Sequence, residues 1–360
     1  MNIPLSNSHD LAFAWSGLPD YAARCIRAVI DRRGGGVTVI GTRPRVPIEG
    51  MEASLGQSVH WVDGHDRSIT WHRFGMTPPK VFIQGGHFLP AFNALGRQAR
   101  LAGACVVLAS DQNWTGSWRQ RFVDPIRARL MSKPRFDGVF VAGNSGERYY
   151  RGMSFPKEAI VQGMYGADPI IFNEGPPLRD RPKQLIFVGQ FIQRKNVVAL
   201  TKAFVRFSMD YPDWMLRICG SGEMRDLLPT HAGIQVEDFV QPPQLAALLR
   251  ESRCLVLPSL REHWGLVVHE AALSGCALAL TDVVGAAADL ARAENAALFP
   301  PGDETAIEHA LRTIATWNRV QWDQAETVSR ALARKFGPER FADAVDQIVD
   351  TLRPGLTANQ

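Results

Sequence analysis

The feature that most restricts the fold of this chain is the regular alternation of short apolar runs with longer segments of helical periodicity. The runs are predominantly apolar, which is typical of strands that are buried on both faces of a parallel sheet. The runs predicted to form strands are LAFAW, GVTVIGT, KVFIQGG, ACVVLAS, DGVFVAG and AIVQGM in the first half, and QLIFVGQ, WMLRICGSG, IQVEDFV, CLVLPSL, CALALTD and AALFP in the second.

The segments between these runs predict helices, and the length of the chain predicts two domains. A chain of 360 residues is too long for one ordinary core. The Pro- and Gly-rich passage NEGPPLRDRPK separates two series of strands and helices. We therefore predict two doubly wound, Rossmann-like α/β domains, over residues 1–172 and 184–336, joined by a linker over 173–183 and followed by a closing segment over 337–360. Ligands of such sheets bind outside the carboxyl ends of the strands, so a cleft between the domains is the expected site.

One stretch is expected to depart from the parallel pattern. SVHWVDGHDRSITWHRF has the character of an antiparallel hairpin that turns at Asp63-Gly64. Its histidines and aspartates are expected to be solvated or to pack, because they have neither helical spacing nor cysteine partners for a metal. The sequence thus predicts no metal site.

Basic and aromatic residues are interleaved in WRQRFVDPIRARLMSKPRF, which is Trp118–Phe136, in a chain whose net charge is +4. Such a stretch is either a solvated helix face or a surface for anionic lipid or a phosphate-bearing partner. No recognisable nucleic-acid module accompanies the charge, so no nucleic-acid partner is expected.

The cysteines and the absence of long apolar runs predict a cytoplasmic protein. The five cysteines are odd in number and scattered, and four stand in strand-like runs, which argues against a disulfide framework. No apolar run approaches the length of a membrane span, and the first residues lack the pattern of a signal peptide. A peripheral position on the inner face of the membrane is compatible with the basic stretch.

Two glutamates in SLREHWGLVVHEAALSG, residues 259–275, stand where a strand, a turn and a helix are expected to follow one another. Glu262 lies just past the strand, and the helix is expected to begin near Trp264-Gly265, where free N–H groups favour phosphates and hydroxyls. Glu270 lies about a turn and a half into this helix, where its carboxylate can accept hydrogen bonds from the vicinal hydroxyls of a ribose. Taken alone, two such glutamates are usually surface residues, but this context favours a binding site.

Two weaker signals lie on the same predicted domain. In FVGQFIQRKNVVAL, Gly189 ends a strand and Lys195 precedes a helix, a place from which a lysine can meet a diphosphate. The strand of ICGSG ends in a G-x-G, which permits close approach to the backbone. Together with the two glutamates, these signals predict a site for a phosphate-bearing ligand.

These motifs resemble those of family four of the retaining glycosyltransferases, which have the GT-B fold of two facing Rossmann-like domains. The resemblance covers nearly the whole chain and is strongest from about Gly166 to Asp289. Its carriers are YGADPIIF, VGQFIQRKN, ICGSGEM, EHWGLVVHEAALSG and the tail FGPERFADAVDQIVDTL, which is similar to the closing helix that returns towards the first domain. The resemblance implies transfer of a sugar from a nucleotide-diphospho-sugar to a glycan or lipid-linked acceptor, with retention of configuration and without a metal.

The resemblance also implies residue roles. Lys195 would hold the donor diphosphate, Glu262 the transferred sugar and Glu270 the ribose. Asp111, in the first and acceptor-binding domain, stands where many relatives carry an active-site histidine. The other implied donor contacts are Gly17, Gly189, Gln190, Arg194, Gly220, Phe239, Val240, His263, Trp264, Gly265 and Leu266.

Departures from the family pattern leave two alternatives open. Gln190 stands where the family usually has arginine, although Arg194 is close enough in sequence to replace that cation, and Asn196 stands where glycine is common. Together with Asp111, these changes are compatible with a non-catalytic nucleotide-sugar-binding protein. A two-domain nucleotide-sugar epimerase shares the same architecture.

Overall fold

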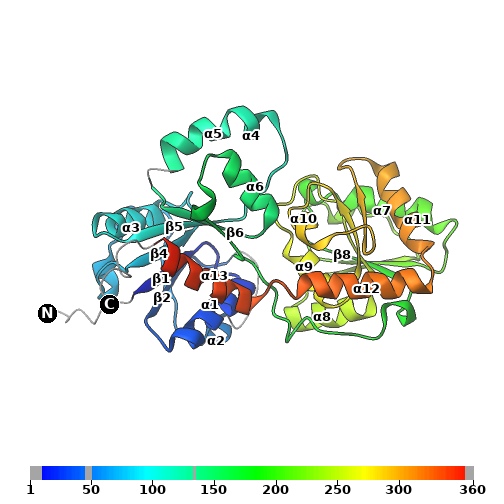
Figure 1. Ribbon diagram of the computed structural model, residues 1–360. Coiled ribbons are helices and arrows are strands. Elements are labelled where there is room, and N and C mark those ends of the chain that lie inside the picture. The colour runs from blue at the N-terminus through cyan, green and yellow to red at the C-terminus, as the bar shows by residue number, and fades with distance from the viewer. Residues whose placement is uncertain (1–9, 45–50, 133–134, 353–360) are drawn as a thin grey trace. The chain divides into compact units, whose positions relative to one another are not determined.

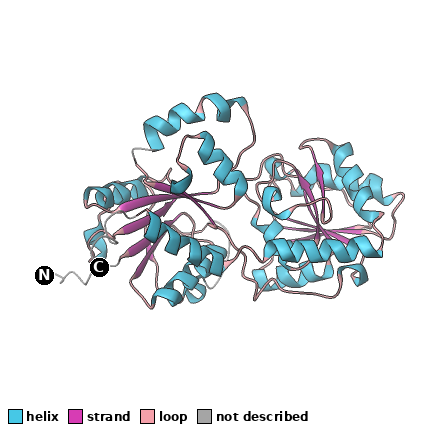
Figure 2. Ribbon diagram, viewed as in Figure 1, coloured by secondary structure: helices cyan, strands magenta, loops and turns pink. Residues whose placement is uncertain are grey.

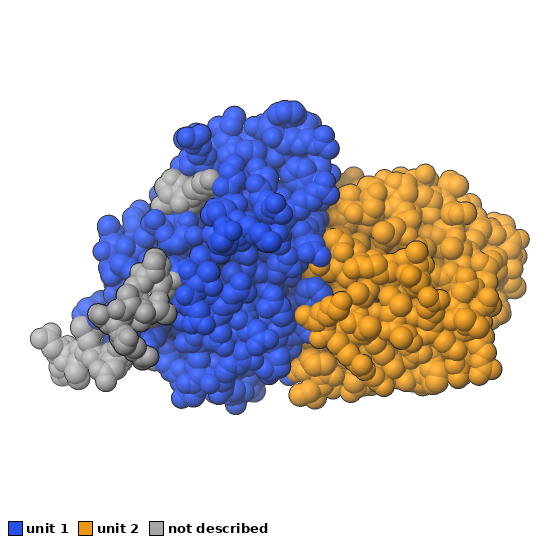
Figure 3. Space-filling model, in the orientation of Figure 1, with its two compact units in different colours: residues 1–166, 336–360 blue, residues 167–335 orange. Residues whose placement is uncertain are grey.

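The chain divides into two compact units, each an α/β structure with its sheet between helices (Figures 1, 2 and 3). Unit 1 comprises residues 1–166 and 336–360, and unit 2 comprises residues 167–335. These are the two Rossmann-like domains that the sequence predicts. The stretches that the computed structural model describes are residues 10–44, 51–132 and 135–352.

The described residues of unit 1 form a parallel sheet in the order β3-β2-β1-β4-β5-β6-β7. The chain moves outward from β1 to β3 and then places β4 on the other side of β1, so the switch point of the sheet lies between β1 and β4. The strands are β1 (Leu11–Trp15), β2 (Val37–Gly41), β3 (His60–Trp61), β4 (Val81–Gly85), β5 (Cys105–Ser110), β6 (Gly138–Val141) and β7 (Ile160–Gln162).

Helices cover both faces of this sheet, and the last helix of the chain belongs to unit 1. The ring of Phe341 on that helix, α13, packs at 6.0 Å from Phe13 and 5.0 Å from Phe140. The return of the closing helix to the first domain, which the resemblance implies, is therefore observed. The helical elements are α1 (Asp20–Arg33), α2 (Met51–Leu55), η1 (Trp71–Phe74), α3 (Pro90–Leu101), α4 (Trp118–Phe122), α5 (Asp124–Arg127), η2 (Ala128–Ser132), α6 (Asn144–Gly152), η3 (Lys157–Ala159) and α13 (Pro338–Thr351).

Unit 2 has a parallel sheet in the order β10-β9-β8-β11-β12-β13, with its switch point between β8 and β11. The strands are β8 (Gln184–Val188), β9 (Met215–Cys219), β10 (Ile234–Glu237), β11 (Cys254–Leu257), β12 (Ala277–Thr281) and β13 (Ala296–Phe299). The helical elements are η4 (Leu178–Asp180), η5 (Gln193–Lys195), α7 (Val197–Ser208), η6 (Arg225–Leu227), α8 (Pro242–Glu251), α9 (Leu266–Leu273), α10 (Ala287–Leu290), α11 (Glu304–Ala315) and α12 (Arg319–Ala333). Among the helices of the described residues, none combines the length and apolar character of a membrane-spanning segment.

The hairpin predicted around Asp63-Gly64 is wrong. Strand β3 pairs in parallel with β2, and the Asp63 carboxylate accepts the N–H of His65, which closes a local turn. The chain after this turn does not pair with β3, because Trp71 is buried in the core. Its ring meets Phe82 edge-on at 5.2 Å, and its Nε1 donates to the carbonyl of Leu95 on α3. Burial of this one large side chain outweighs the local hairpin signal.

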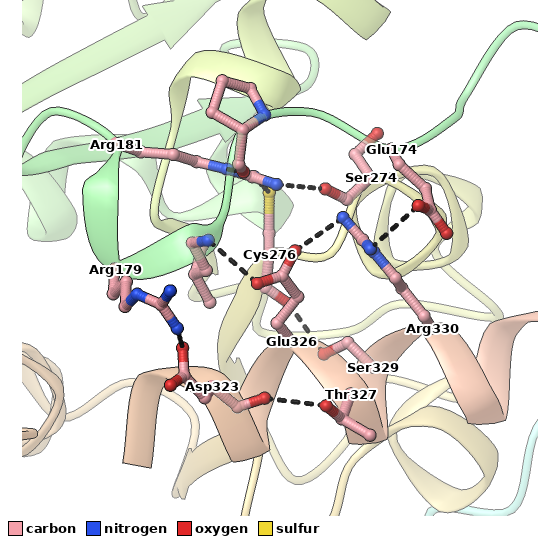
Figure 4. A network of polar contacts seen from close by, with 12 residues as sticks. Glu174, Arg179, Arg181, Ser274, Cys276, Asp323, Glu326, Thr327, Ser329 and Arg330 are labelled. Carbon is pink, nitrogen blue, oxygen red and sulfur yellow. Dashed lines mark hydrogen bonds and ion pairs between the residues drawn. The ribbon is translucent and has the colours of Figure 1, made fainter. Parts of the chain in front are cut away.

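The segment 173–183, which the sequence predicts as a linker, lies within unit 2. Arg181 is buried, and its guanidinium donates to the carbonyl of Ser274 at 2.7 Å (Figure 4). The same guanidinium donates to the carbonyls of Leu249 and Ser252 at 3.2 and 3.0 Å. Because Arg181 closes the end of α8 and the loop after α9, this segment is part of the core structure of unit 2 and not a free spacer.

A buried histidine joins the two ends of unit 2. The Nδ1 of His269 accepts the N–H of Ala167 at 2.9 Å, so the proton of the neutral ring is on Nε2 and is donated to the carbonyl of Ala333 at 2.9 Å. Burial lowers the pKa of His269 to about 4. The side chain is therefore neutral in the folded protein at neutral pH.

This histidine should make unit 2 less stable in mild acid. A histidine in the unfolded chain has a pKa of about 6.5. Because the folded pKa is about 4, the unfolded state binds the extra proton between these values, and stability falls as the pH falls from about 6.5 to about 4. Between pH 7 and pH 5 this amounts to roughly 2 kcal/mol.

We expect His269→Asn to lose this part of the pH dependence, because asparagine can still accept the Ala167 N–H but does not titrate. Urea unfolding of both proteins at pH 7 and pH 5 measures it. The wild type should exceed His269→Asn in free energy of unfolding by less at pH 5 than at pH 7. An equal difference at the two pH values would contradict this account of His269.

Candidate functional site

The loops that follow β8 and β11 meet at the switch point of unit 2. The N–H of Leu260, after β11, donates to the carbonyl of Arg194, after β8, at 2.8 Å. In return, the guanidinium of Arg194 donates to the carbonyl of Arg261 at 2.9 Å. The two loops therefore form one surface outside the carboxyl ends of the strands, where doubly wound sheets bind their ligands.

Two cations and one carboxylate meet on this surface. Lys195 Nζ pairs with one oxygen of Glu262, and Arg194 Nη1 lies 3.3 Å from the other. The hydroxyl of Ser259 also donates to Glu262 at 3.2 Å. The side chains of Lys195 and Glu262 are only 12% and 10% exposed. The cluster carries a net positive charge in a largely desolvated place, which suits a bound anion.

The backbone around Lys195 holds this lysine at the start of α7. Gln193–Lys195 form a single 3₁₀ turn, and Asn196 then adopts a left-handed conformation with φ of 57° before α7 begins at Val197. Asparagine is among the few residues other than glycine that tolerate this conformation, so Asn196 can replace the glycine that the family pattern contains. Its buried Nδ2 has no hydrogen-bond partner in the part of the chain that the structure describes. A ligand could accept this hydrogen bond.

A glycine turn then directs the chain into α9, as the sequence predicts. Gly265 has φ of 86°, and α9 begins at Leu266. A Cβ on Gly265 would lie 3.2 Å from Cγ of Glu262, so glycine also leaves room for that carboxylate. Glu270 is half-buried in the second turn of α9, about 6 Å along the helix from Leu266. Glu262 therefore lies before the start of α9, and Glu270 lies within α9.

The glycines after β9 have a packing role that the sequence analysis did not identify. Gly220 and Gly222 have φ of 147° and 153°, and a Cβ on Gly220 would overlap the carbonyl oxygen of Gly189. A Cβ on Gly222 would lie 2.6 Å from the carbonyl oxygen of Phe191. The N–H of Phe191 donates to the carbonyl of Ser221 at 2.7 Å. These glycines let the loop after β9 pack against the loop that leads to Lys195, while contact of Gly220 with a ligand stays a prediction.

The remaining predicted residues of unit 2 lie beside this centre. Gln190 is exposed directly after Gly189 and brings no charge. The half-exposed ring of Phe239 and Val240 follow β10, whose last residue Glu237 accepts the N–H of Gly220 with its carbonyl at 3.1 Å. The loops after β8, β9 and β10 are thus joined in series by backbone hydrogen bonds. His263 and Trp264 lie between Glu262 and Gly265, and Trp264 is buried.

Ser259 is the residue of this site that sequence reasoning missed. Its hydroxyl contacts Glu262, and its own carbonyl accepts the hydroxyl of Thr281 at 2.7 Å. A serine near the end of the predicted strand run CLVLPSL, three residues before the first glutamate, was a signal, but nothing in the pattern distinguished it from a turn residue.

In unit 1, the two predicted site residues follow strands β1 and β5. Gly17 has φ of 66°, and its N–H donates to the hydroxyl of Thr42 at 2.8 Å. Asp111 accepts the hydroxyl of Tyr165 at 3.4 Å, and the ring of Tyr21 meets Tyr165 edge-on at 5.0 Å. Burial raises the pKa of Tyr165 well above its ordinary value, so this hydroxyl stays protonated and donates to Asp111. Asp111 is thus an oriented carboxylate.

Metal-ligating side chains do not cluster in the described part of the chain. Among those residues, no group of three or more His, Cys, Asp and Glu could hold a metal ion.

The second half of the chain matches a known protein family. Residues 171–326 match the family model described as Glycosyl transferases group 1. Glycogen synthase from Mycobacterium tuberculosis is 27% identical over 177 residues, which are 47% of this chain and 43% of the relative. The chain therefore matches less than half of the length of this curated relative.

Solved structures match over almost the whole chain. Anabaena Alr3699/HepE in complex with UDP and glucose has a TM-score of 0.74 at 12% identity, covering 95% of this chain and 99% of that chain. A glycosyltransferase from Rickettsia africae has a TM-score of 0.72 at 11% identity, covering 98% and 100%. At these identities the likeness concerns the fold, which is that of glycosyltransferases with two Rossmann-like domains.

Two glycine substitutions test the packing of the loops. Gly220→Ala should destabilise unit 2 by about 2 kcal/mol or more, because the new Cβ would overlap the Gly189 carbonyl and the conformation is strained for alanine. Gly189→Ala is the matched control, since its Cβ would meet nothing closer than 3.4 Å. Urea unfolding compares the two, and equal stabilities would contradict the packing role.

Proposed function

We propose that this protein is a glycosyltransferase that moves a sugar from a nucleotide-diphospho-sugar to the hydroxyl of a glycan or lipid-linked acceptor. The observation that carries the proposal is the cluster of Lys195, Arg194 and Glu262 at the switch point of a glycosyl transferases group 1 domain. The likeness to Anabaena Alr3699/HepE, whose crystal contains UDP and glucose, supports a donor of this class. A UDP-sugar is therefore the first donor to test.

The two cations would stabilise the departing diphosphate. Negative charge develops on this group as its bond to the sugar breaks, and preorganised cations in a water-poor site lower the barrier to that step. Because Lys195 and Arg194 both pair with Glu262 before the donor binds, the diphosphate would replace the carboxylate as their partner. Glu262, released from Lys195, could then accept hydrogen bonds from hydroxyls of the transferred sugar.

The other residues would orient the donor and the acceptor. The first N–H groups of α9 would donate to the sugar or phosphate. Glu270 would hold the ribose hydroxyls, and Phe239 would lie beside the base. Asp111 would hold the acceptor hydroxyl from unit 1. In a retaining reaction the acceptor attacks from the face that the diphosphate leaves, and its proton passes to a phosphate oxygen of the donor.

Replacement of Lys195 tests the charge that this reaction needs. We propose that no metal takes part, so Lys195→Ala should lower kcat by on the order of 10²–10³, the usual effect of removing one preorganised charge-stabilising group. Added magnesium should not rescue the variant. Lys202→Ala on the exposed face of α7 is the matched control and should keep its activity.

Steady-state kinetics with a UDP-sugar and a glycan acceptor give the measurement. Normal turnover by Lys195→Ala would remove this residue from the reaction, and loss of wild-type activity with a chelator would contradict the metal-free proposal. Donor binding without any turnover would favour the non-catalytic alternative. Epimerised nucleotide-sugar formed without an acceptor would favour the epimerase.

We propose that the basic stretch Trp118–Phe136 places the protein on an anionic membrane surface, where a lipid-linked acceptor would be found. Trp118 is 71% exposed and Phe122 is 69% exposed on α4. Ile126 on α5 and Leu130 on η2 are similarly exposed. Exposed apolar rings among arginines are the pattern of segments that lie in the interface of an anionic bilayer.

A double substitution tests this surface. Arg121→Glu with Phe122→Ser should weaken binding to phosphatidylglycerol-containing vesicles several-fold at low salt, and high salt should weaken the wild type. The matched control is Arg319→Glu with Val320→Ser, an exposed pair of the same kind on α12 of unit 2. Vesicle co-sedimentation measures both, and equal loss in the two double variants would contradict a specific role for α4.

A further inference from the structure

A cavity of about 460 Å³ lies in unit 1 between α3, the sheet and the residues before β6. This volume is within the range of sites that bind small molecules. Val106, which lines it, is the second residue of β5, whereas Asp111 follows the other end of that strand. The distance along the strand between them is roughly 16 Å. Neither Asp111 nor Gly17 lines the cavity, although Gln84, which does, is paired with Leu108, three residues before Asp111.

Part of the wall of this cavity is apolar, and a glycine within α3 leaves space beside it. Val106 and Phe136 are buried and line the cavity. Gly96 stands in the interior of α3, where glycine weakens a helix. A Cβ on Gly96 would lie 2.7 Å from Oε1 of Gln84, so any larger residue would press into this wall.

A buried hydrogen-bonded pair holds the wall in place. Gln84 is almost completely buried, and its Nε2 donates to Oδ1 of Asn93 at 2.9 Å. The amide of Asn93 in turn donates to the carbonyl of His87 at 2.8 Å. Both amide groups are therefore oriented before any ligand binds, and Oε1 of Gln84 is turned towards Gly96.

Three arginines line the cavity, and two of them have uncompensated charges. Arg100 pairs with Asp137 at 2.7 Å, and the second oxygen of Asp137 accepts the N–H of Val106. Arg97 and Arg135 make no ion pair or hydrogen bond with another residue in the described ranges. Two guanidinium groups beside an apolar cavity suit a ligand with an anionic head and an apolar body, because arginine binds phosphate oxygens in a bidentate way.

Arg135 and Phe136, the last two residues of the basic stretch Trp118–Phe136, line the cavity. Ala128 of η2 and Phe136 pack in the same core on one face of the sheet. Leu101, at the end of α3, lines the cavity and is largely exposed to solvent. A lipid bound in the cavity would therefore lie beside the end of the basic stretch.

We propose that this cavity binds one chain of an anionic lipid, with the chain between Val106 and Phe136 and the phosphate at Arg97 and Arg135. This proposal extends the proposed membrane surface from contact with a bilayer to capture of a single lipid molecule. It does not depend on sugar transfer, because lipid binding is measured without a donor.

Titration calorimetry of the full chain with oleoyl lysophosphatidic acid, kept below its micellar concentration, tests the proposal. We expect saturable binding of one molecule per chain. Arg97→Gln with Arg135→Gln should weaken binding at least tenfold and leave the fold intact, because neither side chain has a described partner. Gly96→Ala should weaken binding by filling the wall, with circular dichroism to check that the variant is folded. Arg67→Gln with Arg319→Gln, two exposed arginines elsewhere, should bind as the wild type does.

Two further probes separate the parts of the ligand. Inorganic phosphate and uncharged monoolein should each bind at least tenfold more weakly than lysophosphatidic acid. If phosphate bound as tightly as lysophosphatidic acid, the cavity would be a phosphate site. If monoolein bound as tightly, the arginines would not contribute to binding. Either result overturns the proposal. Unchanged lipid binding in the Arg97/Arg135 variant overturns it as well. So does binding that is lost in the α4 double variant but kept in the cavity variants, because the lipid would then be on the surface segment alone.

Discussion

The parallel pairing of β8 with β11 is the constraint on which the candidate site of unit 2 depends. Leu185 pairs with Cys254 and Ile186 with Leu255. Because the two strands run in the same direction, the loops that leave their carboxyl ends emerge side by side, and each loop continues to a different half of the sheet. Lys195 and Glu262, which are 67 positions apart in the sequence, can form an ion pair only because this pairing brings their loops together.

The ion pair between Lys195 and Glu262 is better explained by ligand binding than by stability. Two largely buried charges lose much of their hydration, and this cost can cancel the attraction between them. A pair of this kind contributes little net stability, but it holds the side chains of Lys195 and Arg194 in place beside Glu262. An incoming diphosphate would then exchange with one carboxylate and would not have to order two free side chains, which reduces the entropy cost of binding.

The sequence predicts the fold more fully than the contacts between loops. Predominantly apolar strands and amphipathic helices are local patterns, so the sheets could be inferred to be doubly wound. The start of α9 is also local, and it lies where the glycine turn indicates. The hairpin prediction failed because burial of Trp71 against Phe82 is a contact between distant segments. The packing of Gly220 against Gly189 and the burial of Arg181 within the predicted linker are also long-range. The spacing of residues within one segment carries no information about these three long-range contacts, which are those of Trp71, Gly220 and Arg181.

The structure shows how the residues that depart from the family pattern fit into the candidate site. Asn196 adopts the left-handed conformation for which glycine would otherwise be needed. Arg194 could supply the cation that Gln190 does not, because its guanidinium lies 3.3 Å from the carboxylate that also pairs with Lys195. Asp111 is held by Tyr165, whose raised pKa keeps the hydroxyl protonated as a donor. Two cations at one carboxylate suit a diphosphate both when it binds and when it leaves the sugar. The departures at Gln190 and Asn196 are therefore compatible with a donor site.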